Sequence, residues 1–331
     1  MLKKLFSIAA CSAILASSAS ALNIVVVNDD SYETANVQQL KIALETAGHD
    51  VILSVPCAHQ SGKGGSMGSY LKPIPIHNLS ADASGVLSIN DTNGTDGYCV
   101  GNTEAEKETI TFKEYMDGTP LMSSAHGLFK ANEKWSSNPD LVISGPNEGR
   151  NVGFAVFISG TLGAAHLAIY SGVPAIAVSA GSTPDDVTEA LTYAKLVATK
   201  VVDIVEKLES TRKAGETILP LKMGLNVNLP DAGTLSSTTK YKFTNVNWAF
   251  EFNLKWANLG EGYGAYYGYT ADQDLYGLNL IPEVNAVGDT DENSEGIAAE
   301  TFITISTMDA TENAPKAKSA YTSVRLNTLV K

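Results

Sequence analysis

The sequence predicts an α/β protein: a three-layer, Rossmann-like core around a parallel sheet, followed by a β-rich C-terminal extension. Short apolar runs at residues 24–27, 51–55, 140–144 and 173–179 are rich in β-branched residues, as expected of strands buried on both faces. Segments with helical spacing separate these runs, so we expect right-handed β-α-β units. The last third instead contains strands of alternating polarity, which favours a sheet in which one face is less buried than the other.

The N-terminal residues 1–21 have the pattern of a secretory signal peptide. Two lysines precede an apolar segment at 5–15 that is too short to span a bilayer, and small residues end at Ala21. We therefore expect cleavage after Ala21 and export to the periplasm or the medium. A lipoprotein signal at Cys11 is the alternative, but it would leave only residues 5–10 as the hydrophobic segment.

The mature chain, residues 22–331, is long enough for one large domain, with the Rossmann-like core at 22–224 and the C-terminal strands at 225–331. Loss of the two signal-peptide lysines takes the formal net charge from −13 to −15. An acidic surface repels phosphate backbones, so the composition argues against duplex nucleic acid or an anionic membrane as partner. A small phosphorylated substrate remains compatible with it.

Cys57 and Cys99 are the two cysteines outside the signal peptide. In an exported protein they can pair as one disulfide that closes a long loop. Two separate buried thiols are the alternative. The sequence favours the disulfide.

Two adjacent acids, Asp29 and Asp30, follow the first strand directly. Ligands of open α/β sheets bind at the carboxyl ends of the strands, where these acids are expected. Neighbouring carboxylates repel each other, so they require a cation, a shared proton or a basic partner. In the alternative interpretation, one Asp caps the next helix and the other is solvated.

Three further segments carry polar groups at the same edge of the predicted sheet. The glycine-rich loop 56–66, with Ser61 and Ser66, suits close approach to an anion, although a plain flexible loop has the same composition. A turn at 145–153 carries Asn147 and Asn151. Ser159, Gly160 and Thr161 precede a helix of small residues, where free amides and hydroxyls bind phosphate; simple capping is the alternative.

Thr183, Pro184, Asp185 and Asp186 predict a helix start, with Thr183 as the N-cap and the proline at the first helical position. Residues 187–208 then give this helix an apolar stripe.

Residues 241–269 are dense in aromatics, including Trp248 and Trp256. This composition suits β-hairpins that pack on another subunit, or a wall of the substrate crevice on which a nucleobase stacks. We favour the subunit interface, and thus a homodimer or higher homo-oligomer.

Together, the segments at 28–30, 61–62, 144–153, 159–165 and 172–179 resemble the SurE family of metal-dependent phosphatases, in the family's order and approximate spacing. The resemblance implies a metal-dependent phosphomonoesterase acting on nucleoside monophosphates, either a 5′/3′-nucleotidase or a broad acid phosphatase, in a secreted variant. The chain departs from the family pattern at Pro146, Met122 and His166 and in loop 63–65, which bears on substrate preference more than on reaction type.

The resemblance also implies roles for individual residues. One divalent cation (Mg²⁺, Mn²⁺ or Ca²⁺) would be held by oxygen ligands, which suit these ions. The implied ligands are Asp29, Asp30, Ser61 and Asn147, with the two acids also catalytic. The residues implied to bind the phosphate are Ser66, Asn151, Ser159, Gly160 and Thr161. The rival interpretation is an exported α/β ligand-binding protein without turnover, which would share the export signal and acidic surface.

Overall fold

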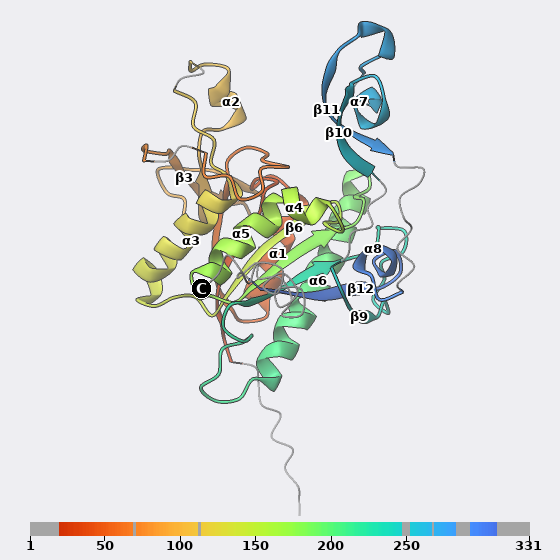
Figure 1. The fold of residues 1–331 in the computed structure, drawn as a ribbon. Coiled ribbons are helices and arrows are strands. Elements are labelled where there is room, and N and C mark those ends of the chain that lie inside the picture. Colours follow the sequence, from red (N-terminus) through yellow and green to blue (C-terminus); the bar gives the residue numbers. More distant parts are fainter. Residues whose placement is uncertain are drawn as a thin grey trace, which may run out of the picture.

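The structure is a computed structural model and shows a sheet between two helical layers (Figure 1). Most of the expected signal peptide, with Cys11, and the aromatic Trp248 lie outside the residues that it describes. Within the described part of the chain, no helix has the length and apolar character needed to cross a bilayer. The described residues are 20–68, 71–111, 114–246, 252–266, 268–282 and 292–309.

Ten strands of the described chain form one mixed, mostly parallel sheet, which confirms the predicted α/β fold class. The strands β5, β2, β1, β6, β7 and β8 run parallel to one another, whereas β3 and β12 are antiparallel to their neighbours β5 and β8. In spatial order the strands are β4 (Leu87–Ile89), β3 (Ile76–Ala81), β5 (Gly97–Val100), β2 (Asp50–Pro56), β1 (Asn23–Val27), β6 (Leu141–Glu148), β7 (Ala175–Ala180), β8 (Met223–Asn228), β12 (Ile303–Asp309) and β9 (Tyr241–Thr244).

Two pairs of long helices cover the two faces of this sheet. Helix α1 (Ala35–Thr46) packs with α6 (Val187–Thr211) on one face, and α3 (Pro120–Trp135) packs with α5 (Gly160–Tyr170) on the other (Figure 1). Four short helices lie in the connections: α2 (Glu104–Lys107), α4 (Ala155–Ile158), α7 (Gly262–Tyr266) and α8 (Glu295–Ala298); a 3₁₀ turn, η1, covers Ala271–Gln273.

The apolar residues of the central strand β1 serve both layers. Ile24 and Val26 belong to the core that includes α1 and α6, and Val25 and Val27 to the core under α3 and α5. Because successive side chains of a strand point to opposite faces, a continuous apolar run is what a strand between two helical layers needs. The physical basis of the sequence prediction is therefore visible in the packing.

The C-terminal third divides into two parts. Strands β8, β12 and β9 continue the main sheet, whereas β10 (Phe252–Asn258) and β11 (Tyr276–Pro282) form a separate antiparallel hairpin that stands away from it (Figure 1). Of this hairpin, the predicted aromatic segment 241–269 supplies only β10, and β11 follows that segment in the chain.

Two local predictions are wrong. Residues Gly145 and Pro146, expected to form a turn, lie inside β6, where a cis peptide bond and a shift of register against β7 carry the strand on to Glu148. The second error concerns helix α6, whose N-cap is Asp186 and not Thr183. The Asp186 side chain accepts hydrogen bonds from the N–H groups of two first-turn residues. The Thr183 side chain does not make these bonds.

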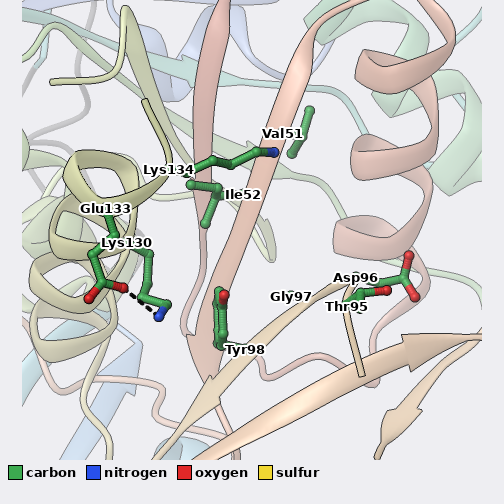
Figure 2. Close-up of a pocket in the computed structure, with 9 residues that line it drawn as sticks. All are labelled: Val51, Ile52, Thr95, Asp96, Gly97, Tyr98, Lys130, Glu133 and Lys134. Carbon is green, nitrogen blue, oxygen red and sulfur yellow. Dashed lines mark hydrogen bonds and ion pairs between the residues drawn. The ribbon is translucent and has the colours of Figure 1, made fainter. Parts of the chain in front are cut away.

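A cavity of about 310 Å³ opens at the amino ends of β2 and β5 (Figure 2). It is thus at the edge of the sheet opposite to the predicted site. Its lysines are already paired, since Lys130 Nζ lies 2.6 Å from Glu133 and Lys134 contacts Asp50. Neither of its lysines therefore offers an unpaired positive charge to a ligand.

Candidate active site

The acid pair lies at the carboxyl end of β1, as predicted. Asp29 and Asp30 are 2% and 3% exposed, so both carboxyl groups are nearly withdrawn from water. Helix α1 begins after Thr34, which is its N-cap, and neither acid caps it. The interpretation of one Asp as a cap and the other as solvated is therefore wrong.

Each acid has its own set of contacts. The Thr161 hydroxyl donates to Asp29 Oδ1 over 2.7 Å, and the Glu148 backbone N–H donates to Asp30 Oδ2 over 2.9 Å. His59 Nε2 lies 3.1 Å from Asp30 Oδ1, and its ring is 59% exposed. One acid is thus anchored to α5 and the other to β6 and the loop after β2.

The electrostatics follow from this burial. Burial, and then repulsion by Asp30, raises the pKa of Asp29 to about 7. The hydrogen bond with Asp30 raises the pKa of His59. Burial, and then Asp30, also raises the pKa of the neighbouring Glu148. Excess negative charge is therefore concentrated at one point, and bringing a cation there would relieve it.

Asn147 supplies a third oxygen beside the pair. It precedes Glu148 in β6, and the register shift in this strand sets the position of its side chain. Its Nδ2 group donates to Gly149 O over 2.7 Å, while its buried Oδ1 atom has no hydrogen-bond partner. A buried carbonyl oxygen left unpartnered costs free energy, so this atom fits a cation ligand.

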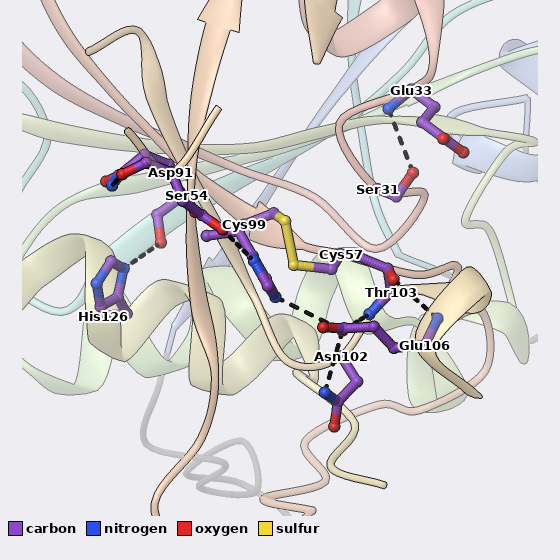
Figure 3. The surroundings of a disulfide bond; sticks show 12 residues. Ser31, Glu33, Ser54, Cys57, Asp91, Cys99, Asn102, Thr103, Glu106 and His126 are labelled. Carbon is purple, nitrogen blue, oxygen red and sulfur yellow. Dashed lines mark hydrogen bonds and ion pairs between the residues drawn. A yellow bond between two sulfur atoms is a disulfide. The ribbon is translucent and has the colours of Figure 1, made fainter. Parts of the chain in front are cut away.

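The loop after β2 is tied to the site from two sides. The disulfide between Cys57 and Cys99, which the structure confirms, joins the end of β2 to β5 (Figure 3). Gln60 N–H donates to the backbone oxygen of Asp29 over 2.7 Å, which brings the next residue, Ser61, near the acids. Ser61 itself is exposed to solvent. Ser66, also exposed, instead accepts a hydrogen bond from Thr119 at its carbonyl group.

Helix α5 begins against the Asp29 carboxylate. Ser159 caps it by accepting from Leu162 N–H, so the capping interpretation of this hydroxyl is correct. A Cβ atom on Gly160 would lie 2.8 Å from Asp29 Oδ2, and one on Gly163 would lie 2.1 Å from Gly64 O. Only glycine at these two positions allows the helix terminus to approach both the acid and the loop.

Asn151 is held beside the site from several directions. Its Nδ2 group donates to Ser179 Oγ over 2.8 Å and to Thr161 Oγ1 over 3.3 Å. Its backbone N–H donates to Asn228 Oδ1 over 2.8 Å. The Thr161 hydroxyl thus accepts a hydrogen bond from Asn151 and donates one to Asp29.

The structure brings most of the predicted residues together. Direct contacts, or contacts of the neighbouring residue, link five of them: Asp29, Asp30, Asn147, Asn151 and Thr161. Ser159 and Gly160 adjoin them at the start of α5, Ser61 lies on the neighbouring loop, and Ser66 is used for local bonds.

Sequence analysis missed His59 and Glu148, although both contact or flank Asp30. A signal was present for His59, which precedes Ser61 by two positions in the loop that was singled out.

A cation at this point would find oxygen donors on Asp29, Asp30 and Asn147, with Ser61 on the neighbouring loop as the fourth oxygen-bearing side chain, a set suited to Mg²⁺, Mn²⁺ or Ca²⁺. Within the described ranges, no cluster of three His, Cys, Asp or Glu side chains is arranged to hold a metal. The neutral oxygens are therefore needed to complete the set. Fold and site together define an α/β protein whose sheet edge suits a divalent cation beside an anion-binding helix terminus.

The chain belongs to the SurE family: the model of the family described as survival protein SurE matches residues 24–251. It is similar to an acid phosphatase of Yarrowia lipolytica, with 33% identity over 232 residues that cover 67% of this chain and 60% of that protein. It is also similar to a 5′-nucleotidase SurE of Desulfitobacterium hafniense, with 34% identity over 161 residues, 49% of this chain and 52% of that protein.

The fold matches the crystal structure of SurE protein from Aquifex aeolicus with a TM-score of 0.61 and 21% identity, over 92% of this chain and 99% of that one. This likeness concerns the fold alone. The matched segments span 60% and 52% of the length of the two curated relatives named above.

Proposed function

We propose that this chain is a divalent-metal-dependent phosphomonoesterase that hydrolyses nucleoside monophosphates. The observation that carries the proposal is the buried pair Asp29 and Asp30 at the sheet edge, next to the unpartnered Oδ1 atom of Asn147. The pair has one partly exposed basic neighbour, His59, so two buried carboxylates beside it still carry excess negative charge that a cation would neutralise. The names of the relatives, acid phosphatase and 5′-nucleotidase SurE, support a phosphomonoester as the substrate class.

Different residues of the site would bind the phosphate, fix the carboxylates and donate a proton. When bound, the cation would polarise a phosphoryl oxygen. The N–H groups at the start of α5, next to Gly160 and Thr161, suit the remaining phosphate oxygens. Thr161 and the Glu148 N–H fix the two carboxylates, so that little reorganisation is needed during reaction. His59 lies 3.1 Å from Asp30, which raises its pKa, and it is placed to donate a proton to the leaving alcohol.

The decisive experiment is phosphate release by purified residues 22–331 after exhaustive chelation and after adding back Mn²⁺ or Mg²⁺. The substrates are 5′- and 3′-nucleoside monophosphates and a phosphomonoester without a base. We expect no activity with chelator and full recovery with metal. Activity that survives chelation would overturn the metal mechanism, and metal-dependent binding without turnover would favour the ligand-binding alternative.

The same proposal includes export and self-association. The charged start, short apolar segment and small residues before Leu22 support cleavage near Ala21, followed by release to the periplasm or the medium. The projecting β10–β11 hairpin supports a homodimer or higher homo-oligomer.

A further inference from the structure

A second buried acid, Glu295, lies outside the site described above. It is the first residue of α8 and its side chain is fully withdrawn from solvent, with 0% exposure. Among the ion pairs formed by the described residues, none includes it. A buried carboxylate without a cation costs free energy, which an apolar side chain in the same place would avoid. Its position therefore calls for an explanation other than core packing.

The contacts of Glu295 lead to the β8 strand. Asn226 Nδ2 donates to Glu295 Oε2 over 3.1 Å and to Asn151 O over 3.0 Å. In its ionised form the Glu295 carboxylate only accepts hydrogen bonds, so it requires the Nδ2 side of the Asn226 amide to face it. That same orientation presents an N–H group to the Asn151 carbonyl. Without Glu295, the buried amide would be free to turn its oxygen toward Asn151.

Asn151 connects this pair to the reacting groups. Its Nδ2 group donates to Thr161 Oγ1 over 3.3 Å, and that hydroxyl donates to Asp29 Oδ1 over 2.7 Å. Asn228 Nδ2 adds a second bond to Asn151 O over 3.3 Å. A buried path through Asn226, Asn151 and Thr161 thus joins Glu295 to the acid pair, and each hydrogen-bond donor along it is an uncharged group.

We propose that Glu295 is a positioning residue, which fixes Asn151 and Thr161 through the Asn226 amide and so sets the phosphate-binding side of the site. The inference rests on the proposed function, because it assigns Glu295 a part in holding the phosphate group. Glu295 itself does not reach the substrate. Burial raises the pKa of Glu295 to about 7, and the Ser306 hydroxyl, Asn226 and the Gly153 N–H partly offset this rise.

The test uses Glu295→Gln, which keeps the shape but replaces the charged acceptor of the Asn226 N–H group with a neutral amide. We expect the KM for a nucleoside monophosphate and the Kd of the metal-loaded protein for inorganic phosphate to rise about tenfold, the size of one lost hydrogen bond to a charged group. The kcat should fall less, and the Kd for Mn²⁺, measured by calorimetry, should stay within about twofold. Glu295→Asp, which withdraws the carboxylate by one methylene group, should shift KM and Kd in the same direction if Glu295→Gln does not fold.

A double-mutant cycle separates positioning from a general loss of stability. In an Asn226→Ala background, Glu295→Gln should change KM and the phosphate Kd by less than about twofold, because the link is already broken. The matched control is Glu209→Gln, a buried acid in α6 whose bonds of 2.7 and 2.9 Å go to Arg212. It should lower the melting temperature and leave KM unchanged.

Two outcomes would overturn the inference. One is an unchanged KM and phosphate Kd in both Glu295 variants, and the other is an effect that adds fully to that of Asn226→Ala. If the wild-type protein binds phosphate in a metal-dependent manner but releases none from any substrate, the proposed function fails. The positioning role is then still decided by the phosphate Kd values.

Discussion

The two acids at the end of β1 are the residues on which the proposed chemistry depends most directly. Asp29→Asn or Asp30→Asn should each reduce kcat about 10³-fold, the size typical of losing one preorganised electrostatic group. The fold should persist, because removing a charge from a repelling buried pair does not destabilise it. Phosphate release by each variant, with its melting temperature, checks both statements.

The control for this experiment is Asp50→Asn. Asp50 lies at the amino end of β2, where it bonds to Lys134 and Trp135 far from the acid pair. A loss of activity in this variant as large as in the Asp29 variant would contradict the assignment.

The raised pKa of Asp29 makes the stability of the metal-free protein depend on pH. The folded-state value of about 7 lies above the ordinary value of 3.8, so the folded state binds the proton more tightly than the unfolded state does. The stability from this group is complete below about pH 4 and is lost as the pH rises through 7. With chelator present, the melting temperature should therefore fall between pH 5.5 and 8.

Asp29→Asn should reduce the pH dependence of the melting temperature. The dependence that remains should come from Glu295, whose pKa is also raised. Mn²⁺ should stabilise the wild-type protein more at pH 8 than at pH 5.5, because the metal competes with the proton. Equal slopes for wild type and variant would show that Asp29 does not titrate in this range.

At the scale of single elements, the Cys57–Cys99 disulfide holds the β3–β4–β5 region to the end of β2 and closes a loop with a sequence separation of 42. Closing a loop of this length stabilises the folded state by about 4 kcal/mol in the chain-entropy model. Cys57→Ala with Cys99→Ala should therefore lower the free energy of unfolding by about that amount. Urea unfolding measures it.

Thiol titration provides an independent check of the same bond. Denatured, unreduced mature protein should show no free thiol, and two after reduction. One or more free thiols before reduction would contradict the disulfide.

The elements that the sequence revealed are those determined by neighbouring residues. The apolar run of β1 followed by Asp29 and Asp30 predicted both a buried strand and a site at its end. The continuation of β6 through Pro146 was not predictable in this way, because pairing with β7 outweighs the local turn preference of Gly-Pro. The contact of Asn226 with Glu295 was also missed, since the two residues are 69 positions apart and only the sheet brings them together.

At the scale of the whole molecule, the hairpin β10–β11 presents apolar side chains to solvent. Trp256 and Leu278 lie opposite each other in its register and are 75% and 62% exposed. Such a surface is typical of an interface between subunits. Trp256→Ala with Leu278→Ala should reduce the oligomer mass measured by light scattering, whereas Lys255→Ala, on the other face of the hairpin, should leave it unchanged.

The competing role for these side chains is stacking on a nucleobase. In that case the mass should hold, while KM rises for nucleotides and not for a phosphomonoester without a base. Trp248, the other tryptophan expected at the interface, lies outside the described residues.

Export is the second prediction at this scale. The mature protein should begin at Leu22, whose side chain is buried and whose N–H donates to His49 Nδ1 over 3.2 Å, one residue before β1. N-terminal sequencing of exported protein decides it. Met1 at the N-terminus, or a lipid on Cys11, would refute the prediction.

The position of β12 in the sheet also determines when the sheet can be completed during synthesis. This strand separates β8 from β9, and it is the last described strand of the chain. At ordinary synthesis rates of about 5–20 residues per second, several seconds pass after β8 before β12 is translated. During that time β8 has an open edge, which promotes pairing with other chains. Glu295 also emerges late, so the proposed positioning of Asn151 and Thr161 should be completed only then. Ribosome-bound chains arrested before Ile303 should therefore remain sensitive to protease, and the nascent protein should gain activity only after residues 295–309 have left the ribosome.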